Sequence, residues 1–401
     1  MAPARVTADP LVVVGASLAG LRAVESARRS GYAGPLVLVG AEQHLPYDRP
    51  PLSKAFLAAD PEPPVETSYR TNDELRALNV EVRLGEAATG LDIDAHRVLL
   101  GDERLSYSSV ILATGAQARP LAGDSPAGVH TLRTVDDARR IRQALDSSRR
   151  TVVIGGGFIG SEVAAAARKR GHQVTIVEAA PLPLTRAVGE LAAWCSALHA
   201  RHGTELRCDV TVTAFEGEGR VERVLLSDGS ILPADLVVVG IGAEPTTGWL
   251  RGSGLTLDDG IVCDATLRAA EDVYAAGDVA RWHNQLFDEQ MRLEHWTSAA
   301  EQGAVAARNA LDPAAAKPCS TVPYFWSDWY DDKLQMVGVA ATDDVHTIGG
   351  PDAERWLALY RRGDRLAGAL SLNLPGKIMK YRAMIGRGTS WADAVDVAGA
   401  P

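Results

Sequence analysis

Short, fully apolar runs recur along the chain, and glycine-rich turns follow two of them. Residues 11–14 read LVVV and residues 152–154 read VVI, and each run leads through glycines into a stretch of helical character. Runs of this kind are typical of strands buried on both faces of a parallel sheet. The first pattern predicts a strand at Leu11–Val14, a helix at Leu21–Ser30 and a parallel strand at Pro35–Val39.

A second unit of the same layout begins at Thr151. It predicts a strand at Val152–Ile154, a helix over 160–170 that ends before a glycine, and a strand at Gln173–Val177. Two such βαβ units predict an α/β protein with two Rossmann-like dinucleotide-binding domains. Other strands are expected at Asn79–Leu84, Val98–Leu100, Ser109–Ala113, Val221–Leu226 and Asp235–Gly240.

Two segments depart from this alternation. The sequence PYDRPPLSK (46–54) is too rich in proline for a regular helix or a central strand, so we expect an irregular connection there. From about Tyr324 the chain carries several aromatic residues and predicts a separate C-terminal α+β domain.

Composition narrows the possible functions. The chain has 401 residues and a formal net charge of −10, which argues against a general nucleic-acid binder because phosphates would be repelled. No run approaches the length of a membrane span, and residues 1–10 lack a signal-peptide pattern, so a cytoplasmic protein is expected. The four cysteines form no C-x-x-C pair and match no zinc or haem spacing.

The glycines of the second unit carry the strongest chemical signal. Gly155, Gly157 and Gly160 form a complete G-x-G-x-x-G between strand and helix, where backbone N–H groups approach a pyrophosphate. Glu178 ends the next strand, and an acid there accepts hydrogen bonds from a ribose 2′-hydroxyl and repels a 2′-phosphate. The second unit is therefore expected to bind NAD in preference to NADP.

The first unit is less regular. Gly15 and Gly20 are present, but Ser17 replaces the middle glycine, and the acid after the second strand is Glu42. Serine still permits a tight turn, although its side chain crowds a pyrophosphate. A unit that holds FAD beside one that receives NADH predicts a flavoprotein reductase. The segment VYAAGDVA (273–280) reads as a strand that ends in Gly277 and Asp278, and Asp278 is placed to accept hydrogen bonds from flavin ribityl hydroxyls, with an exposed loop aspartate as the alternative.

Several motifs along nearly the whole chain resemble one family. They are GASLAG (15–20), PYDRPPLSK (46–54), ATG (113–115), LRTVDDA (132–138), GGGFIGSE (155–162), GIGAEP (240–245), AAGDVA (275–280), EHWTSAAEQG (294–303) and YFWSDWYDDKLQMVG (324–338). The chain resembles the FAD-dependent, NADH-using ferredoxin reductases of oxygenase systems, the group of putidaredoxin reductase and biphenyl dioxygenase reductase, with a glutathione-reductase-like fold. The resemblance implies an FAD-binding domain in two parts, 1–115 and 244–320, an NAD-binding domain at 116–243 and a C-terminal domain at 321–401.

The resemblance also implies roles for individual residues. Lys54 would approach flavin N5, where a cation stabilises the reduced ring, and Glu162 would pair with Lys54 or with the nicotinamide. The alternatives are an exposed loop lysine and a first-turn glutamate that favours the helix dipole, and the second is compatible with the pairing. Other FAD contacts would be Arg49, Thr114, Gly115, Arg133, Asp278, Trp296 and Trp326, and further NAD contacts Ile159 and Gly242. For the two tryptophans, ordinary core packing is the alternative.

The implied partner is a [2Fe–2S] ferredoxin that supplies a haem-thiolate monooxygenase or a Rieske-type oxygenase. A ferredoxin of this kind is usually acidic, so an acidic reductase needs a local basic patch. Lys377, Lys380, Arg382 and Arg387 are the candidates, with a solvated helix face as the alternative. An NADH oxidase, a peroxidase-like or rubredoxin-reductase-like flavoprotein and an NADH-sensing flavoprotein remain competing functions.

Overall fold

The computed structural model describes residues 9–59, 67–121, 123, 125–340 and 343–399. The chain divides into two compact units, and it enters each unit more than once. The first unit comprises Met1–Asp48, Thr67–Gln117 and Glu244–Pro323, and the second comprises Arg49–Glu66, Ala118–Ala243 and Tyr324–Pro401. The domain boundaries expected from the sequence stay a prediction. In the described part of the chain, no helix is both long and apolar enough to cross a membrane.

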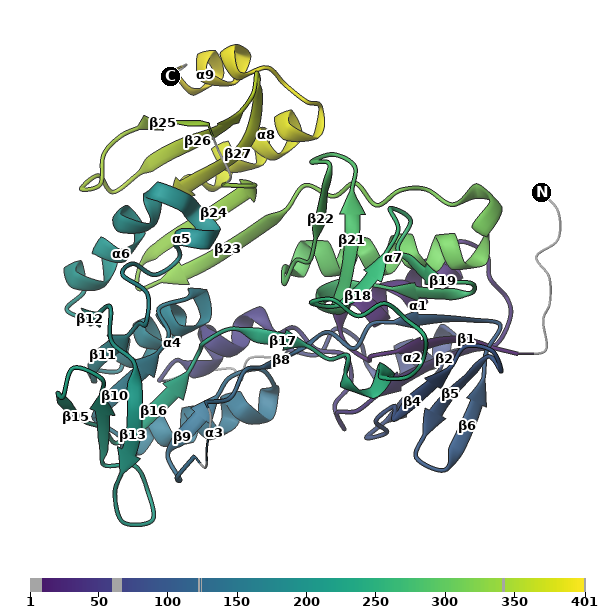
Figure 1. The fold of residues 1–401 in the computed structure, drawn as a ribbon, viewed down its shortest axis with the longest axis horizontal. Coiled ribbons are helices and arrows are strands. Elements are labelled where there is room, and N and C mark those ends of the chain that lie inside the picture. The colour runs from purple at the N-terminus through teal and green to yellow at the C-terminus, as the bar shows by residue number, and fades with distance from the viewer. Residues whose placement is uncertain (1–8, 60–66, 122, 124, 341–342, 400–401) are drawn as a thin grey trace. The chain divides into compact units, whose positions relative to one another are not determined.

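The first unit is built on a six-stranded sheet (Figure 1). Its order is β19 (Arg268–Ala270), β20 (Val273–Ala275), β7 (Ser109–Leu112), β1 (Leu11–Val14), β2 (Leu36–Gly40) and β3 (Glu81–Leu84). Only the edge strand β19 is antiparallel to its neighbour. Strands β1, β2 and β7 are buried at every position, as their apolar sequences predict.

Helices α1 (Leu18–Arg29) and α7 (Trp296–Leu311) pack closely in this unit. A Cβ atom on Gly303 would lie 2.2 Å from the carbonyl oxygen of Ala19, so glycine is needed at this crossing. The unit also contains α2 (Asn72–Ala77), an antiparallel sheet of β4 (Gly90–Asp92), β5 (Arg97–Leu100) and β6 (Glu103–Ser106), and a sheet of β18 (Ile261–Cys263), β21 (Ala280–Asn284) and β22 (Glu289–Met291).

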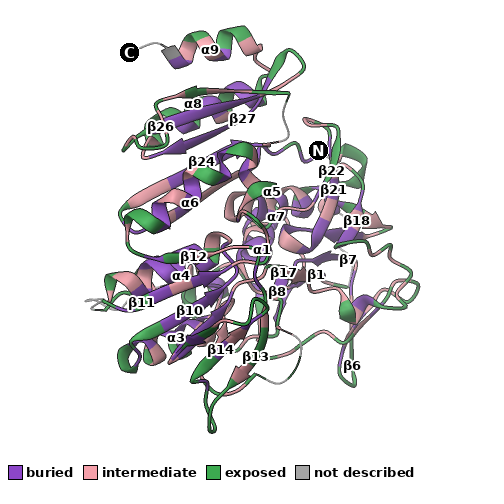
Figure 2. Ribbon diagram, turned by 60° about the vertical axis from the view of Figure 1, so that its left-hand side comes forward, coloured by how far each residue is buried: buried purple, intermediate pink, exposed green. Residues whose placement is uncertain are grey.

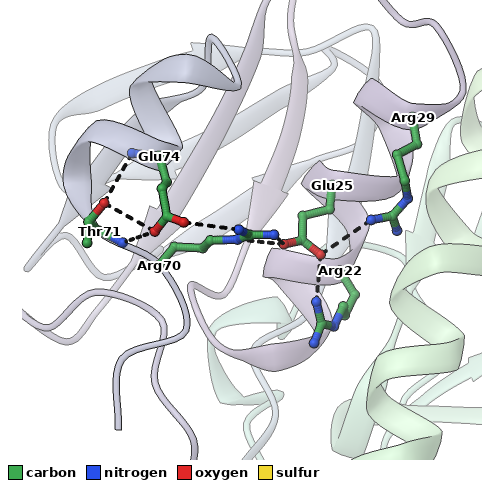
Figure 3. Close-up of polar contacts among 6 residues, drawn as sticks. All are labelled: Arg22, Glu25, Arg29, Arg70, Thr71 and Glu74. Atoms are coloured by element: carbon green, nitrogen blue, oxygen red, sulfur yellow. Dashed lines mark hydrogen bonds and ion pairs between the residues drawn. The ribbon is translucent and has the colours of Figure 1, made fainter. Parts of the chain in front are cut away.

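A buried carboxylate joins α1 to the segment before α2 (Figure 3). Glu25 is 2% exposed, and Arg22 and Arg70 both donate hydrogen bonds to it. Arg70 also bonds Glu74, which forms a capping box with Thr71 at the start of α2. The ion pairs therefore tie the two helices together.

The second unit contains the second glycine-rich turn. Its parallel sheet has the order β12 (Glu205–Arg207), β11 (Gln173–Val177), β10 (Arg150–Ile154), β16 (Leu236–Val239) and β9 (Val129–Thr131). Figure 2 shows most of β10 in the buried colour. The accompanying elements are α3 (Val135–Ser147), α4 (Phe158–Lys169), α5 (Thr185–Val188), α6 (Ala192–Arg201), β13 (Val212–Glu216), β14 (Arg223–Leu226) and β15 (Ile231–Pro233).

The C-terminal part of the second unit is a five-stranded antiparallel sheet with two helices. The strand order is β23 (Tyr324–Trp329), β24 (Asp332–Gly338), β27 (Arg365–Leu372), β26 (Trp356–Arg362) and β25 (Asp344–Ile348), and the helices are α8 (Pro375–Gly386) and α9 (Trp391–Gly399). One apolar cluster joins this sheet to α6 through Trp329, Leu198 and Cys195. The expected fold class, two Rossmann-like sheets with an α+β segment, is confirmed.

Some expected boundaries were wrong by a few residues. Helices α1 and α4 begin at Leu18 and Phe158, before the expected positions 21 and 160, because the last glycine of each turn lies inside the first helical turn. Strand β14 begins at Arg223 instead of Val221. The segment over 46–54 contains a single turn of 3₁₀ helix, Pro50–Ser53, as its prolines suggest.

Candidate functional site

In each unit a glycine-rich turn connects the central strand to a helix under the same steric constraint. In the first unit, Gly15 has φ +122°, and a Cβ atom there would lie 2.1 Å from the carbonyl oxygen of Ala113, the residue that follows β7. A Cβ atom on Gly20 would lie 1.9 Å from the carbonyl oxygen of Gly15. Both positions require glycine, because backbone atoms occupy the space of a side chain.

The second unit repeats this geometry. A Cβ atom on Gly155 would lie 2.4 Å from the carbonyl oxygen of Gly240, and one on Gly160 would lie 2.1 Å from that of Gly155. The middle position differs, since a Cβ atom on Gly157 would meet nothing closer than 3.9 Å. Ser17 occupies this open position in the first unit, so serine there is compatible with the turn.

The helices that follow these turns present their N-termini without a side-chain cap. Neither Ser17 before α1 nor Gly157 before α4 makes a side-chain capping hydrogen bond. The first N–H groups of a helix favour an anion, and a turn without bulky side chains lets a pyrophosphate approach them. Both turns therefore fit a dinucleotide.

An acid lies near each turn. Glu178 follows β11, and its carboxylate accepts hydrogen bonds from the backbone N–H of Gly156 at 2.8 Å and of Ala180 at 2.9 Å. Glu42 lies two residues beyond β2 and accepts a hydrogen bond from the Tyr47 hydroxyl at 2.5 Å. Both acids are half-buried at corresponding strand ends.

Other predicted flavin contacts of the first unit gather at the same edge of its sheet. Thr114 and Gly115 follow β7, and Asp278 follows β20. Because β20, β7 and β1 are adjacent and parallel, their carboxyl ends lie beside the Gly15 turn. The Thr114 hydroxyl donates to the carbonyl oxygen of Thr246 at 3.0 Å.

Trp296, the first residue of α7, is held by two residues that sequence analysis missed. Its indole N–H donates to Asp48 at 2.8 Å and to the Tyr69 hydroxyl oxygen at 2.7 Å, and Tyr69 donates to Asp48 at 2.5 Å. Burial and the hydrogen bond to Asp48 raise the pKa of Tyr69, so its hydroxyl stays protonated. Asp48 lies within the motif at 46–54, but its partners are remote in sequence.

In the second unit, Lys54 forms an ion pair with Glu162. The Lys54 ammonium lies 2.8 Å from Oε2 of Glu162 and 3.2 Å from the carbonyl oxygen of Pro50. The Glu162 side chain is 2% exposed and accepts further hydrogen bonds from the hydroxyls of Ser53 and Ser327. Glu162 lies beyond the first turn of α4, so the alternative of a first-turn glutamate is wrong.

The remaining predicted residues also belong to the second unit. Arg49 donates to the carbonyl oxygen of Arg133 at 2.6 Å, and Trp326 stacks on Tyr324 with ring centroids 5.8 Å apart. Ile159 is 44% exposed in the first turn of α4. Gly242 follows β16 with φ +101°. The predicted flavin contacts are thus divided between the units, with Arg49, Lys54, Arg133 and Trp326 in the second.

The four cysteines are free thiols. Burial raises the pKa of Cys195, Cys263 and Cys319 to about 12. It also raises the pKa of Cys208, with Glu178 and Asp209 adding to the effect. A thiol must ionise to act as a nucleophile, so the raised pKa values lower the reactivity of these thiols.

The comparison with known families decides where this geometry belongs. The model of the pyridine nucleotide-disulphide oxidoreductases matches residues 9–303. The chain belongs to this family. A second model, of a reductase C-terminal domain, matches residues 324–399. In this member of the family the four cysteines are free thiols, and three of them are buried.

Relatives within this family match nearly the whole chain. The ferredoxin–NAD(+) reductase component of the anthranilate 1,2-dioxygenase system of Burkholderia cepacia is 37% identical over 389 residues, which is 95% of each chain. Putidaredoxin reductase of Pseudomonas putida is 36% identical, covering 94% of this chain and 92% of the relative. The crystal structure of a covalent putidaredoxin reductase–putidaredoxin complex matches with a TM-score of 0.89 at 35% identity, covering 95% of this chain and 93% of that chain. The resemblance inferred from the motifs is confirmed.

Proposed function

We propose that this protein is a flavoprotein ferredoxin reductase. It takes a hydride from NADH and delivers single electrons to a [2Fe–2S] ferredoxin, which supplies a haem-thiolate monooxygenase or a Rieske-type oxygenase. The observation that carries the proposal is the pair of turns, because Gly15 and Gly20 repeat the steric constraint of Gly155 and Gly160 on a separate parallel sheet. The names of the two relatives, a ferredoxin–NAD(+) reductase component and a putidaredoxin reductase, support the ferredoxin as partner.

The proposal assigns one nucleotide to each turn. FAD would be held at Gly15, Ser17, Gly20, Glu42, Thr114, Gly115 and Asp278, and NADH at Gly155, Gly157, Gly160, Glu178, Ile159 and Gly242. A bound flavin supplies the chemistry that divides a two-electron hydride donor into single electrons. The protein supplies binding, orientation and charge.

Two side chains are proposed to act on the flavin. The Lys54 ammonium, fixed by Glu162, would supply a positive charge that stabilises the reduced ring. Trp296, fixed by Asp48, would shield the ring. Because the pKa values of the buried thiols are raised, we propose that electrons pass from the flavin to the ferredoxin without a cysteine intermediate.

We propose that the ferredoxin docks on the α8 patch, defined as Lys377, Lys380, Arg382 and Arg387. Lys377, Lys380 and Arg387 are exposed, and so is the apolar side chain of Met379, which precedes Lys380 in α8. Arg382 is half-buried with its guanidinium 6.0 Å from the ring centre of Tyr324. Exposed cationic side chains and an exposed apolar side chain on one helix suit an acidic partner of a protein whose own net charge is −10. We also propose a cytoplasmic location. Four free thiols are consistent with it, because the cytoplasm keeps cysteines reduced.

An anaerobic absorbance titration of the purified protein with NADH, repeated with NADPH, tests the function. We expect a bound-flavin spectrum that bleaches with about one equivalent of NADH and poorly with NADPH. Absence of flavin, or a flavin that does not respond to NADH, would overturn the proposal. Rapid oxygen consumption without ferredoxin would favour an oxidase, and a stable complex without ferredoxin turnover would favour a sensor.

A further inference from the structure

The carboxylate of Glu162 receives its hydrogen bonds from two separate segments of the second unit. Ser53 and Lys54, which are neighbours in sequence, both contact Oε2. Ser327 in β23 donates to Oε1 at 2.5 Å, and among the described residues no other side chain donates a hydrogen bond to that oxygen. The orientation of the carboxylate plane therefore depends on Ser327.

Trp329 determines which way the Ser327 hydroxyl points. An indole N–H only donates, and that of Trp329 lies 2.8 Å from Ser327 Oγ. The single proton of Ser327 is therefore directed to Glu162. Trp329 is 1% exposed and stacks on His199, with ring centroids 4.9 Å apart. Burial lowers the pKa of His199 to about 4, so the stacked imidazole is neutral.

We propose that Ser327, oriented by Trp329, is a positioning residue for the Lys54–Glu162 pair. Ser53, Glu162 and Ser327 are each at most 3% exposed, and a carboxylate this deeply buried is stable only when its oxygens are hydrogen-bonded. Loss of the Ser327 hydroxyl leaves Oε1 without a donor, so the carboxylate turns and releases Lys54. The effect on the ion pair is independent of any cofactor, whereas its effect on flavin reduction rests on the proposed function.

Ser371 provides a matched control in the same sheet. It lies in β27, its side chain is fully buried, and it pairs with Gln335 in β24 and Leu357 in β26. Its hydroxyl has no hydrogen-bond partner among the residues that the structure describes. Ser371→Ala thus removes a buried serine hydroxyl without touching Glu162, whereas Ser327→Ala removes one that holds it. Ser327→Thr keeps a hydroxyl at the critical position.

The first test uses flavin-free protein. Trace acetylation with acetic anhydride, read by peptide mass spectrometry, reports the reactivity of Lys54 relative to the exposed Lys317. We expect Lys54 to react several-fold faster in Ser327→Ala than in the wild type, with Ser371→Ala unchanged and Ser327→Thr close to the wild type. Equal Lys54 reactivity in Ser327→Ala and wild type, or an equal rise in Ser371→Ala, would overturn the proposal. Thermal unfolding establishes that each variant is folded.

The second test measures flavin reduction by NADH in anaerobic stopped flow. We expect Ser327→Ala to lower the limiting rate about tenfold, the size expected for one lost hydrogen bond to a charged group, with little change in the NADH concentration at half-saturation. An unchanged limiting rate in Ser327→Ala would overturn the assignment of Ser327 as a positioning residue for flavin reduction. Failure of the proposed function is distinguishable, because the wild type itself would then not bleach with NADH, whereas the acetylation result would stand.

Discussion

The indole nitrogen of Trp296 donates a hydrogen bond to a carboxylate oxygen of Asp48 across 2.8 Å, although 248 positions separate the two residues in sequence. The Tyr69 hydroxyl donates to the same oxygen. The carboxylate of Asp48, which lies two residues before Pro50, therefore anchors the start of α7.

Removal of this anchor is expected to destabilise the protein. Asp48→Ala leaves two part-buried donors with one acceptor fewer, which should lower the free energy of unfolding by about 2 kcal/mol. Urea unfolding of the flavin-free protein measures the loss, and tryptophan fluorescence reports the altered surroundings of Trp296. The control Asp73→Ala removes an exposed carboxylate whose ion-pair partner among the described residues is Arg76, and it should change stability by less than about 0.5 kcal/mol. Equal stability of both variants would contradict the anchoring role.

The two kinds of glycine position in the second turn should respond differently to substitution. Gly160→Ala places a Cβ atom 2.1 Å from the carbonyl oxygen of Gly155, so we expect a loss of at least about 2 kcal/mol of stability. Gly157→Ser has room within the protein, and Ser17 occupies the corresponding position of the first turn, so stability should be kept while the added side chain crowds the pyrophosphate and lowers NADH affinity about tenfold. Urea unfolding and NADH titration separate the two effects. Unaltered NADH binding by Gly157→Ser would place the pyrophosphate elsewhere.

Nucleotide preference is expected to depend on Glu178. Replacing Glu178 by alanine together with Ala179→Arg should raise kcat/KM for NADPH at least about tenfold, because the acid that repels a 2′-phosphate is gone and a cation is added. The same change should lower the efficiency with NADH and loosen the turn, because Gly156 and Ala180 lose their acceptor. Glu205→Gln, an exposed acid on the neighbouring strand, is the control. A wild-type preference for NADPH would show that Glu178 does not select the nucleotide.

Substitutions in the α8 patch are expected to slow electron transfer to the ferredoxin but not to small electron acceptors. Charge reversal at Lys377 and Lys380 should slow ferredoxin reduction, with the larger effect at low ionic strength, because surface charges are screened by salt. Reduction of a small dye should be spared. Lys317→Glu in the first unit is the control for charge reversal at an exposed lysine outside the patch. If ferredoxin reduction by the double variant matched that of the control at every salt concentration, docking on this patch would be excluded.

The Glu25 cluster predicts a dependence of stability on pH. Burial acts to raise the pKa of Glu25, but the hydrogen bonds and charges of Arg22 and Arg70 outweigh it and lower the pKa below its ordinary value of 4.5 (Figure 3). A carboxylate with a lowered folded-state pKa adds stability above its unfolded pKa and loses it as pH falls through the folded value. Glu25→Gln should therefore be less stable at pH 7 and show a shallower decline below pH 4.5. Urea unfolding at a series of pH values measures this. If the free energy of unfolding fell equally steeply with pH in Glu25→Gln and in the wild type, the pairing of Glu25 with the arginines would be contradicted.

The sequence by itself determined the two βαβ units, the irregular proline segment and the α+β character of the C-terminal part. These features depend on local signals, namely apolar runs and glycine or proline at fixed offsets. The same local signals placed the helix starts a few residues late, because the turn glycines Gly20 and Gly160 are also helical residues.

Only the tertiary structure decided which atoms surround the candidate site. Gly15 and Gly155 must be glycine because the carbonyl oxygens of Ala113 and Gly240 lie against them, and those residues come from strands far along the chain. The donors around Glu162 likewise come from Ser53 and Ser327, which no local pattern connects. A sequence motif specifies a residue type and a backbone turn, whereas hydrogen-bond partners depend on which distant segments the packed sheet brings together.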